Sequence, residues 1–250
     1  MINIKSDWEI ELMRKASLIV AETHKYLIPY IKPGITTLEL DRIAEDFIRK
    51  SGATPSCKNY NGFPATLCIS INDEVVHGIP SKRKLVNGDI VSIDVCACYK
   101  GYHGDSAWTY KVGEVSNDKS YLMEHTEKAL YKGIEQVKPG NRIGDISFAI
   151  EKYAKAHNLG VVRELVGHGV GNNLHEDPEV PNYGKAGCGP MLRPGMVIAI
   201  EPMLNLGSPN INMLDDDWTI VTEDSSPSAH FEHTVLVTDD GCDILTKRVI

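Results

Sequence analysis

Two aspartates, Asp94 and Asp105, begin and end the stretch DVCACYKGYHGD and give the first indication of chemistry. The apolar residues around Asp94 predict a strand, and Lys100 and Gly101 predict the two-residue turn of a hairpin. In that hairpin Cys96 faces Asp105, and Asp94 lies diagonally from Asp105 on the same face. The diagonal spans roughly 7–8 Å between Cα atoms, so both carboxylates could reach one cation. Two solvated turn acids remain an equally good interpretation of this hairpin alone.

Three further potential ligands lie beside glycines or predicted strands. His168 stands between glycines in LVGHGVG, Glu201 follows the apolar run of PGMVIAIE, and Glu232 precedes a strong strand pattern at 234–237. A glutamate beside a buried strand is costly unless it is paired or bound to metal. The glycines around His168 could let the backbone approach a ligand closely. A lone histidine in such a turn, whether His168 or His175, is nevertheless more often structural.

Taken together, four carboxylates and one imidazole form a hard ligand set. Such a set fits Mn, Fe(II) or Co better than a structural zinc, and four acids can hold two dications. Two other kinds of site are excluded, because the sequence does not contain their complete motifs. The GHGVG loop lacks the ending of a phosphate loop, and His175-Glu176 does not continue to the HExxH pattern of zincins.

Length and composition are typical of an ordinary globular protein. The 250 residues are 42% hydrophobic, and their net charge of −8 argues against a general nucleic-acid binder. No apolar run approaches the ~18 residues of a membrane span, and the polar N-terminus does not form a signal-peptide core. We therefore expect a cytoplasmic protein. Six cysteines without a CxxC pair favour reduced, mostly buried thiols.

The elements that must position these residues occur twice. Capping boxes at Ser6 and Thr36 predict two helices, the first of which stops near Pro29. The Lys-Pro-Gly opening before the second helix recurs 106 residues later, and the strand expected to end in Asp94 is echoed 107 residues later by one ending in Glu201. This pattern predicts two similar α/β halves that bring Asp94 and Glu201 together and share one core.

The motifs DVCACYKGYHGD, LVGHGVG, AIEP and FEHTVLVTDDG together resemble the metal-binding motifs of type I methionine aminopeptidases. The likeness continues through PATLCISINDEVVHGIP and MLDDDWTIVTED and covers essentially the whole chain. It implies the α/β (α+β) pita-bread fold, in which two pseudo-symmetric halves form a central antiparallel sheet covered by helices. We expect a single catalytic metallopeptidase domain over residues 1–250, with halves of roughly 1–115 and 116–250.

The resemblance also implies a centre with two divalent metal ions. By this likeness Asp94 chelates one ion, His168 and Glu201 bind the other, and Asp105 and Glu232 bridge them. Two such ions would supply hydroxide near neutral pH and anchor a free amino terminus. Their identity stays open among Mn, Fe(II) and Co.

Three residues take catalytic roles in this interpretation. Glu201 would accept a proton from water and return it to the leaving amine. His77 and His175 match the family's two substrate-contacting histidines. His175 would donate to the oxygen that develops charge, and His77 would position the peptide. Without the resemblance, His77 would be assigned to capping the turn before Gly78.

The family's methionine pocket maps onto residues that are apolar or aromatic, namely Cys57, Tyr60, Phe63, Cys68, Leu174 and Trp218. A flexible thioether packs well against aromatic faces and sulfur. Phe63 and Leu174 depart from the commonest bacterial pattern, so the apolar character of the pocket is expected while its shape stays open.

The resemblance implies removal of the initiator methionine from nascent proteins and peptides, with a small second residue preferred. We expect a short, bacterial-like, monomeric form that meets the ribosome transiently and binds neither membranes nor specific nucleic acids. A prolidase or aminopeptidase P would share all five ligands, but those enzymes usually carry a large additional N-terminal domain. The second alternative is a binding protein that has lost its metals, but the presence of all five ligand types argues against it.

Overall fold

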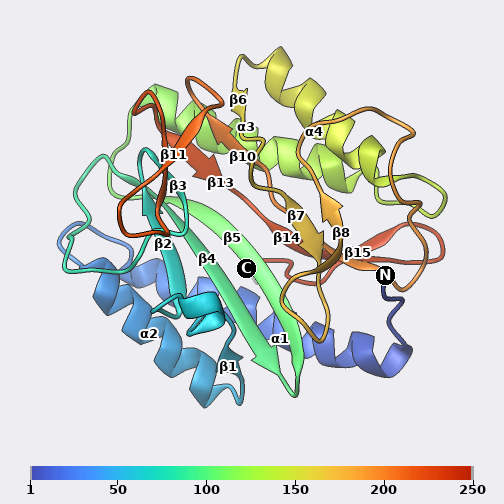
Figure 1. Cartoon of the computed structure of the whole chain (residues 1–250). Coiled ribbons are helices and arrows are strands. Elements are labelled where there is room, and N and C mark those ends of the chain that lie inside the picture. The colour runs from blue at the N-terminus through green and yellow to red at the C-terminus, as the bar shows by residue number, and fades with distance from the viewer. Residues whose placement is uncertain (1, 249–250) are drawn as a thin grey trace.

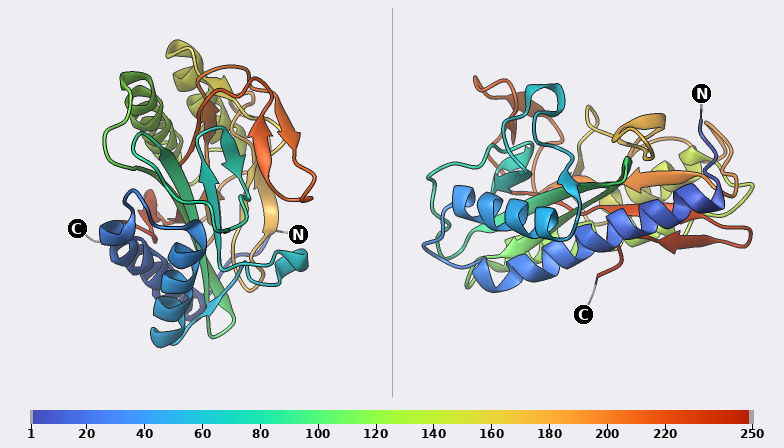
Figure 2. Two further views of the ribbon diagram at one scale, coloured as in Figure 1. Left: turned by 90° about the vertical axis from the view of Figure 1, so that its left-hand side faces the viewer. Right: turned by 90° about the horizontal axis from the view of Figure 1, so that it is seen from below.

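Two pairs of helices cover one face of the strands, and loops rise from the opposite face (Figures 1 and 2). The structure is a computed structural model that describes residues 2–248. Its first half contains α1 (Asp7–Leu27), the short helix η1 (Ile28–Tyr30), α2 (Thr37–Lys50), β1 (Thr54–Pro55), η2 (Tyr60–Gly62), β2 (Leu67–Ile71), β3 (Glu74–Val76), β4 (Ile90–Tyr99) and β5 (Tyr102–Lys111). The second half contains α3 (Asn117–Ile134), α4 (Ile143–Ala156), β6 (Gly160–Val161), β7 (Gly167–Gly169), β8 (Glu176–Val180), β9 (Val197–Ile200), β10 (Met203–Asn205), β11 (Ile211–Met213), β12 (Ile220–Thr222), β13 (Ser228–His230), β14 (His233–Val237) and β15 (Cys242–Ile244).

The helices begin where the sequence predicted. The backbone N–H of Ser6 donates to Glu9 and that of Thr36 donates to Glu39, each at 2.8 Å, so both capping boxes form. Helix α1 ends at Leu27, immediately before the short turn that contains Pro29. A proline removes a backbone donor and cannot continue the hydrogen-bond ladder.

The predicted duplication is visible in the elements themselves. Helices α2 and α4 both have 14 residues, and the second begins 106 residues after the first. Each follows a turn whose glycine has a left-handed backbone, with φ of +98° at Gly34 and +90° at Gly140. Helices α1 and α2 belong to the first half, and α3 and α4 lie together over the second half (Figure 1).

The hairpin of β4 and β5 has the predicted register. Cys96 pairs with Asp105 and Asp94 with Ala107. The two turn residues have φ of +51° and +87°, which suits a tight hairpin turn. One detail was wrong, because β4 does not end at Asp94 but continues to Tyr99. A carboxylate need not end a strand when its side chain points to the face away from the helices.

Alternation along β4 decides which residues reach that face. Val91, Ile93 and Val95 pack in one apolar cluster with residues of α1 and α2. Side chains of a strand alternate between its two faces, so Asp94 and Cys96 point away from the helices. The acid-bearing side of the hairpin therefore faces the second half of the molecule.

All strand pairs in the described residues are antiparallel, as expected, but they form several hydrogen-bonded sheets. The two largest have the orders β1-β4-β2, with β5 beside β4, and β15-β14-β9-β7-β8. The backbone N–H of Glu232 donates to Ala107, and the Thr234 hydroxyl donates to the carbonyl of Asp105. These bonds hold the middle of β5 against the start of β14.

The apolar interior differs from the expected single core. The two largest clusters lie one in each half, and the second-half cluster also includes Ile90 and Trp108 of the first half. Each half has its own pair of helices to bury, which explains the division. Three cysteines are buried, whereas Cys188 is exposed, so mostly buried thiols were predicted correctly for only half of the six. No helix in residues 2–248 is long and apolar enough to span a membrane.

Candidate metal centre and substrate pocket

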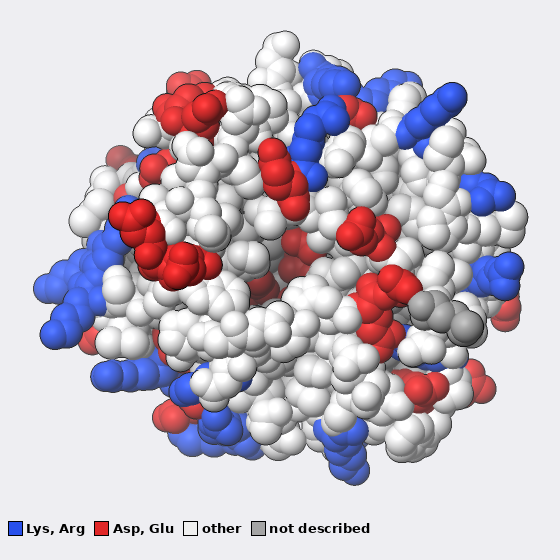
Figure 3. Space-filling view, in the orientation of Figure 1, with Lys and Arg blue, Asp and Glu red and all other residues white. Residues whose placement is uncertain are grey.

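Every site residue proposed from the sequence lines one cavity of about 430 Å³ between the two halves. Its polar end is formed by Asp94, Asp105, His168, Glu201 and Glu232, and its more apolar end by Cys57, Tyr60, Phe63, Cys68, Leu174 and Trp218, with His77 and His175 between them. The space-filling view shows acidic side chains at the bottom of a depression near the middle of this face (Figure 3).

Strands hold the polar end of the cavity. Asp94 and Asp105 lie on β4 and β5, Glu201 directly follows β9, and Glu232 directly precedes β14. His168 is the middle residue of β7. Because a strand fixes the direction of each side chain, these ligands point into the cavity with little freedom.

The donor atoms of the polar end form two overlapping groups. Asp94, Cys96 and Asp105 offer donor atoms that all lie within 4.8 Å of one another, and so do Asp105, His168 and Glu232. Asp105 belongs to both groups. His168 Nε2 lies 3.8 Å from Asp105 Oδ2 and 3.6 Å from Glu201 Oε1. This overlap is the arrangement that a shared ligand between two cations requires.

Burial makes this concentration of carboxylates costly. Desolvation raises the pKa of Glu201 and that of Asp105 to about 8. It also raises the pKa values of Asp94 and Glu232 well above their ordinary range, and neighbouring carboxylates add to the shift. Asp105 and Glu232 are buried, and Asp94 and Glu201 are half-buried, so four acids this close must either keep protons or be neutralised by cations.

His168 presents a lone pair to the nearby carboxylates. His168 Nδ1 lies 2.9 Å from the carbonyl oxygen of Gly169, which can only accept, so Nδ1 carries the proton and Nε2 presents a lone pair. Burial lowers the pKa of His168 to about 3, so the ring is neutral at pH 7. Among residues 2–248, neither Glu232 Oε1 nor His230 Nε2 has a hydrogen-bond partner, although both residues are buried. Lone pairs that face carboxylates repel them, so this donor set fits bound cations.

The glycines around His168 have a different role from the one predicted. A Cβ atom on Gly167 would collide with the carbonyl oxygen of Ala199, and one on Gly169 with that of Asp177. These glycines therefore allow β7 to lie close to its neighbouring strands, rather than allowing a ligand to approach the backbone.

Two further histidines, His77 and His175, line the same cavity. The His175 ring centroid is 4.1 Å from that of His168, and His175 Nδ1 lies 2.8 Å from the Tyr60 hydroxyl. His77 meets the Trp218 ring edge-on at 6.2 Å and has a left-handed backbone with φ of +58°. Such a backbone is uncommon outside glycine and is found at functional sites. Burial lowers the pKa of both histidines.

Loops form most of the apolar end. Phe63 and Trp218 pack edge to face with ring centroids 5.1 Å apart. Leu174 is 3% exposed and packs in the same cluster as Cys57 and Cys68. The pocket is apolar as predicted, and its walls come from chain segments far apart in sequence.

Sequence reasoning assigned no role to two ionisable residues that line the cavity, His230 and Cys96. His230 is 2% exposed, and its Nε2 lies 3.5 Å from Glu201 Oε2. Cys96 lies between the two aspartates of the hairpin. Both stand two residues from a proposed ligand, and the predicted hairpin register had already placed Cys96 opposite Asp105, on the face of Asp94.

A buried cluster of acids and neutral histidines beside an apolar pocket defines a class of protein, the metal-dependent hydrolases. The sequence pattern of metallopeptidase family M24 matches residues 11–239. The chain belongs to this family, and its resemblance to it is confirmed.

Individual relatives resemble the chain over nearly its whole length. The chain is 56% identical over 247 residues to methionine aminopeptidase 1 of Bacillus subtilis, which covers 99% of this chain and 100% of that protein. The crystal structure of methionine aminopeptidase from Rickettsia prowazekii matches with a TM-score of 0.97 at 43% identity and covers 98% of this chain and 100% of the other. Prolidase from Pyrococcus furiosus matches with a TM-score of 0.81 at 26% identity, covering 99% of this chain but 66% of the prolidase. These neighbours have the pita-bread fold, and so does this chain.

Proposed function

We propose that the chain is a metal-dependent aminopeptidase that removes the N-terminal methionine from peptides and nascent proteins, with a preference for a small second residue. The observation that carries the proposal is that one cavity is lined by both the cluster of candidate ligands and the apolar pocket. The relatives named above support it, because those with the highest identity are methionine aminopeptidases over their full length.

The metal centre of this proposal holds two divalent cations, Mn, Fe(II) or Co. Asp94 would hold one, His168 and Glu201 would hold the other, and Asp105 and Glu232 would be shared by the pair. The overlap of the two donor groups at Asp105 and the unpartnered oxygen of Glu232 support the bridging roles. When bound, two cations supply hydroxide near neutral pH and attract the free amino group of the substrate.

Side chains of this chain then move protons and hold the peptide. Glu201 accepts the proton of the attacking water and returns it to the leaving amine. His175 donates a hydrogen bond to the oxygen that gains charge at the scissile carbonyl. The contact between Tyr60 and His175 Nδ1 fixes the ring so that Nε2 is the nitrogen available to the substrate. His77 orients the peptide from the opposite wall.

The methionine side chain occupies the apolar end of the cavity. Cys57, Cys68 and the two packed rings of Phe63 and Trp218 offer sulfur and aromatic faces, which suit a thioether. Residues 1–250 act as one catalytic unit, because residues of both halves are required for the centre. We further propose a cytoplasmic monomer that meets nascent chains at the ribosome.

One substrate panel tests the activity against its closest alternative. Purified protein loaded with Mn, Fe(II) or Co is offered Met-Ala-, Met-Pro- and Xaa-Pro-containing peptides, and the released amino acids are measured. We expect turnover of both methionine peptides and none of Xaa-Pro peptides with other first residues. Turnover that requires proline at the second position, regardless of the first residue, would identify a prolidase-like enzyme instead.

A further inference from the structure

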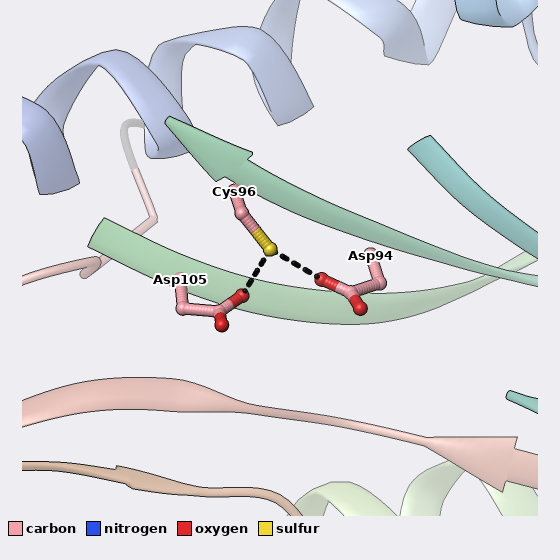
Figure 4. A group of neighbouring side chains, drawn as sticks. All are labelled: Asp94, Cys96 and Asp105. Atoms are coloured by element: carbon pink, nitrogen blue, oxygen red, sulfur yellow. Dashed lines mark hydrogen bonds between the residues drawn. The ribbon is translucent and has the colours of Figure 1, made fainter. Parts of the chain in front are cut away.

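A cysteine lies between the two aspartates of the β4–β5 hairpin. Cys96 Sγ is 2.9 Å from Asp105 Oδ1 and 3.5 Å from Asp94 Oδ1, and the residue is 2% exposed (Figure 4). The three side chains point from adjacent strands toward the same part of the cavity. None of the roles proposed above uses this thiol.

We propose that Cys96 is a thiolate ligand of the cation held by Asp94 and Asp105, and that it makes this end of the centre prefer cations that accept sulfur. Fe(II), Co(II), Zn(II) and Cd(II) belong to this class, whereas Mn(II) and Mg(II) favour oxygen. The inference rests on the proposed metal centre and adds a donor of a different chemical kind to it.

Geometry supports one shared ion. Donor atoms bound to one cation at ~2.0–2.3 Å lie roughly 3–4 Å apart. The mutual distances of the three donors, all within 4.8 Å, need only a small adjustment to meet this range. Independently, the buried Oε1 atom of Glu232 in the same cavity has no hydrogen-bond partner among the described residues. That atom fits a cation in the ligand cluster, which reaches the Cys96 group through the shared residue Asp105, and it argues against a closed network of hydrogen bonds.

Binding requires the thiol to lose its proton. The S–H bond of Cys96 breaks, the proton passes to solvent and a bond between sulfur and metal forms, with no change in oxidation state. The Cys57 thiol lies 3.1 Å from Cys96 Sγ and can donate to it. A hydrogen bond to a ligand sulfur stabilises the charge that the sulfur carries.

The competing interpretation keeps Cys96 protonated, as a donor to Asp105. In that case Cys96 would only orient the carboxylate, and metal preference would follow the oxygen ligands. The two interpretations differ in whether a bond forms between the sulfur and the metal. Spectroscopy detects such a bond, and the measurement needs no substrate turnover.

Cobalt supplies the test. The metal-free full-length protein is titrated with Co(II) under anaerobic conditions, and the visible cobalt bands report binding while the near-ultraviolet region reports sulfur-to-cobalt charge transfer. We expect a charge-transfer band in the wild type and in Cys98→Ser, and its loss in Cys96→Ser. Cys98 is the matched control, since it lies two residues along the same strand but does not line the cavity.

A second measurement tests the preference of the site for cations that accept sulfur. Cys96→Ser should lose about tenfold or more in Cd(II) affinity while Mn(II) affinity changes by less than about threefold. Cobalt that binds the wild type without a charge-transfer band would overturn the thiolate and leave the metal centre standing. A band that survives in Cys96→Ser and disappears in Cys57→Ser would assign the sulfur to Cys57 and overturn the proposal. Wild-type protein that binds no cobalt at all would overturn both the thiolate and the proposed centre.

Discussion

The two ends of the cavity are built differently. At the polar end, each ligand lies on a strand or directly beside one, and residues of both halves contribute. At the apolar end, only Cys68 lies on a strand, and the other pocket residues lie on loops or the short helix η2. Both ends are lined by buried and half-buried residues, and the carboxylates are gathered at the polar end.

This difference separates chemistry from selectivity. A metal centre tolerates errors of only tenths of an ångström in ligand position, so its residues belong on elements whose side-chain directions are fixed. An apolar pocket works by shape and area, so loops that vary in packing can change preference without disturbing the ligands. Changes at the polar end should therefore abolish activity, and changes at the apolar end should only redirect it.

The largest expected effect is loss of a bridging carboxylate. Asp105→Asn or Glu232→Gln should lower turnover by more than about a thousandfold and reduce metal content, because the remaining ligands cannot hold two mutually repelling cations. Chelation of the wild type should do the same, with recovery on addition of Mn, Fe(II) or Co. Metal analysis and turnover of a Met-Ala peptide measure both effects. Undiminished turnover with either variant would remove that residue from the centre.

His175 lies between the two ends and should show an intermediate effect. His175→Ala should lower kcat by roughly a hundredfold to a thousandfold, with KM and metal content nearly unchanged, because one donor to the developing charge is lost. His168→Ala is the comparison and should lose metal. A matching loss of metal from His175→Ala would show that the roles of the two histidines are wrongly assigned.

A change of pH should affect metal binding at the polar end of the cavity and not the apolar end. With pKa values raised to about 8, Asp105 and Glu201 are largely protonated at pH 6 in the metal-free protein, and cations must displace those protons. In the metal-free protein the raised pKa values of these two groups stabilise the folded state most below about pH 4. This stabilisation is lost as the pH rises through about 8. Apparent Mn(II) affinity should therefore rise by up to about tenfold per pH unit for each displaced proton, and level off above pH 8.

Calorimetric titration from pH 5.5 to 8.5 measures this dependence, and thermal unfolding with and without Mn(II) gives an independent reading. The metal-induced increase in Tm should grow over the same range. An affinity that is constant between pH 5.5 and 8 would contradict competition between protons and metal at these carboxylates.

The smallest expected effect belongs to Leu174 at the apolar end. Replacing it with phenylalanine should favour methionine over leucine at the substrate N-terminus by about tenfold in kcat/KM, because an aromatic wall restricts branched side chains. The variant should keep its full metal content. An unchanged ratio would mean that Leu174, although buried in the pocket wall, does not shape selectivity.

The sequence alone predicted the local elements and proposed the residues that the structure brings together in one cavity. Turn chemistry at Lys100 and Gly101 and the period of two along each strand were enough to predict that Asp94 and Asp105 share a face, because both rules act over a few residues. The capping boxes and the repeat near 106 residues similarly predicted the helices and the two halves. The metal and substrate roles came from the resemblance to a family and stay predictions.

Only the tertiary structure decided how distant segments meet. His168, Glu201 and Glu232 reach the hairpin because β5 bonds to the start of β14 across the two halves, and no local pattern encodes that contact. The same is true of His230 beside Glu201 and of Tyr60 beside His175. The role of the glycines around His168 in strand packing likewise depends on contacts with neighbouring strands. Long-range contacts depend on how whole surfaces pack, so one chain segment cannot specify them without its partner.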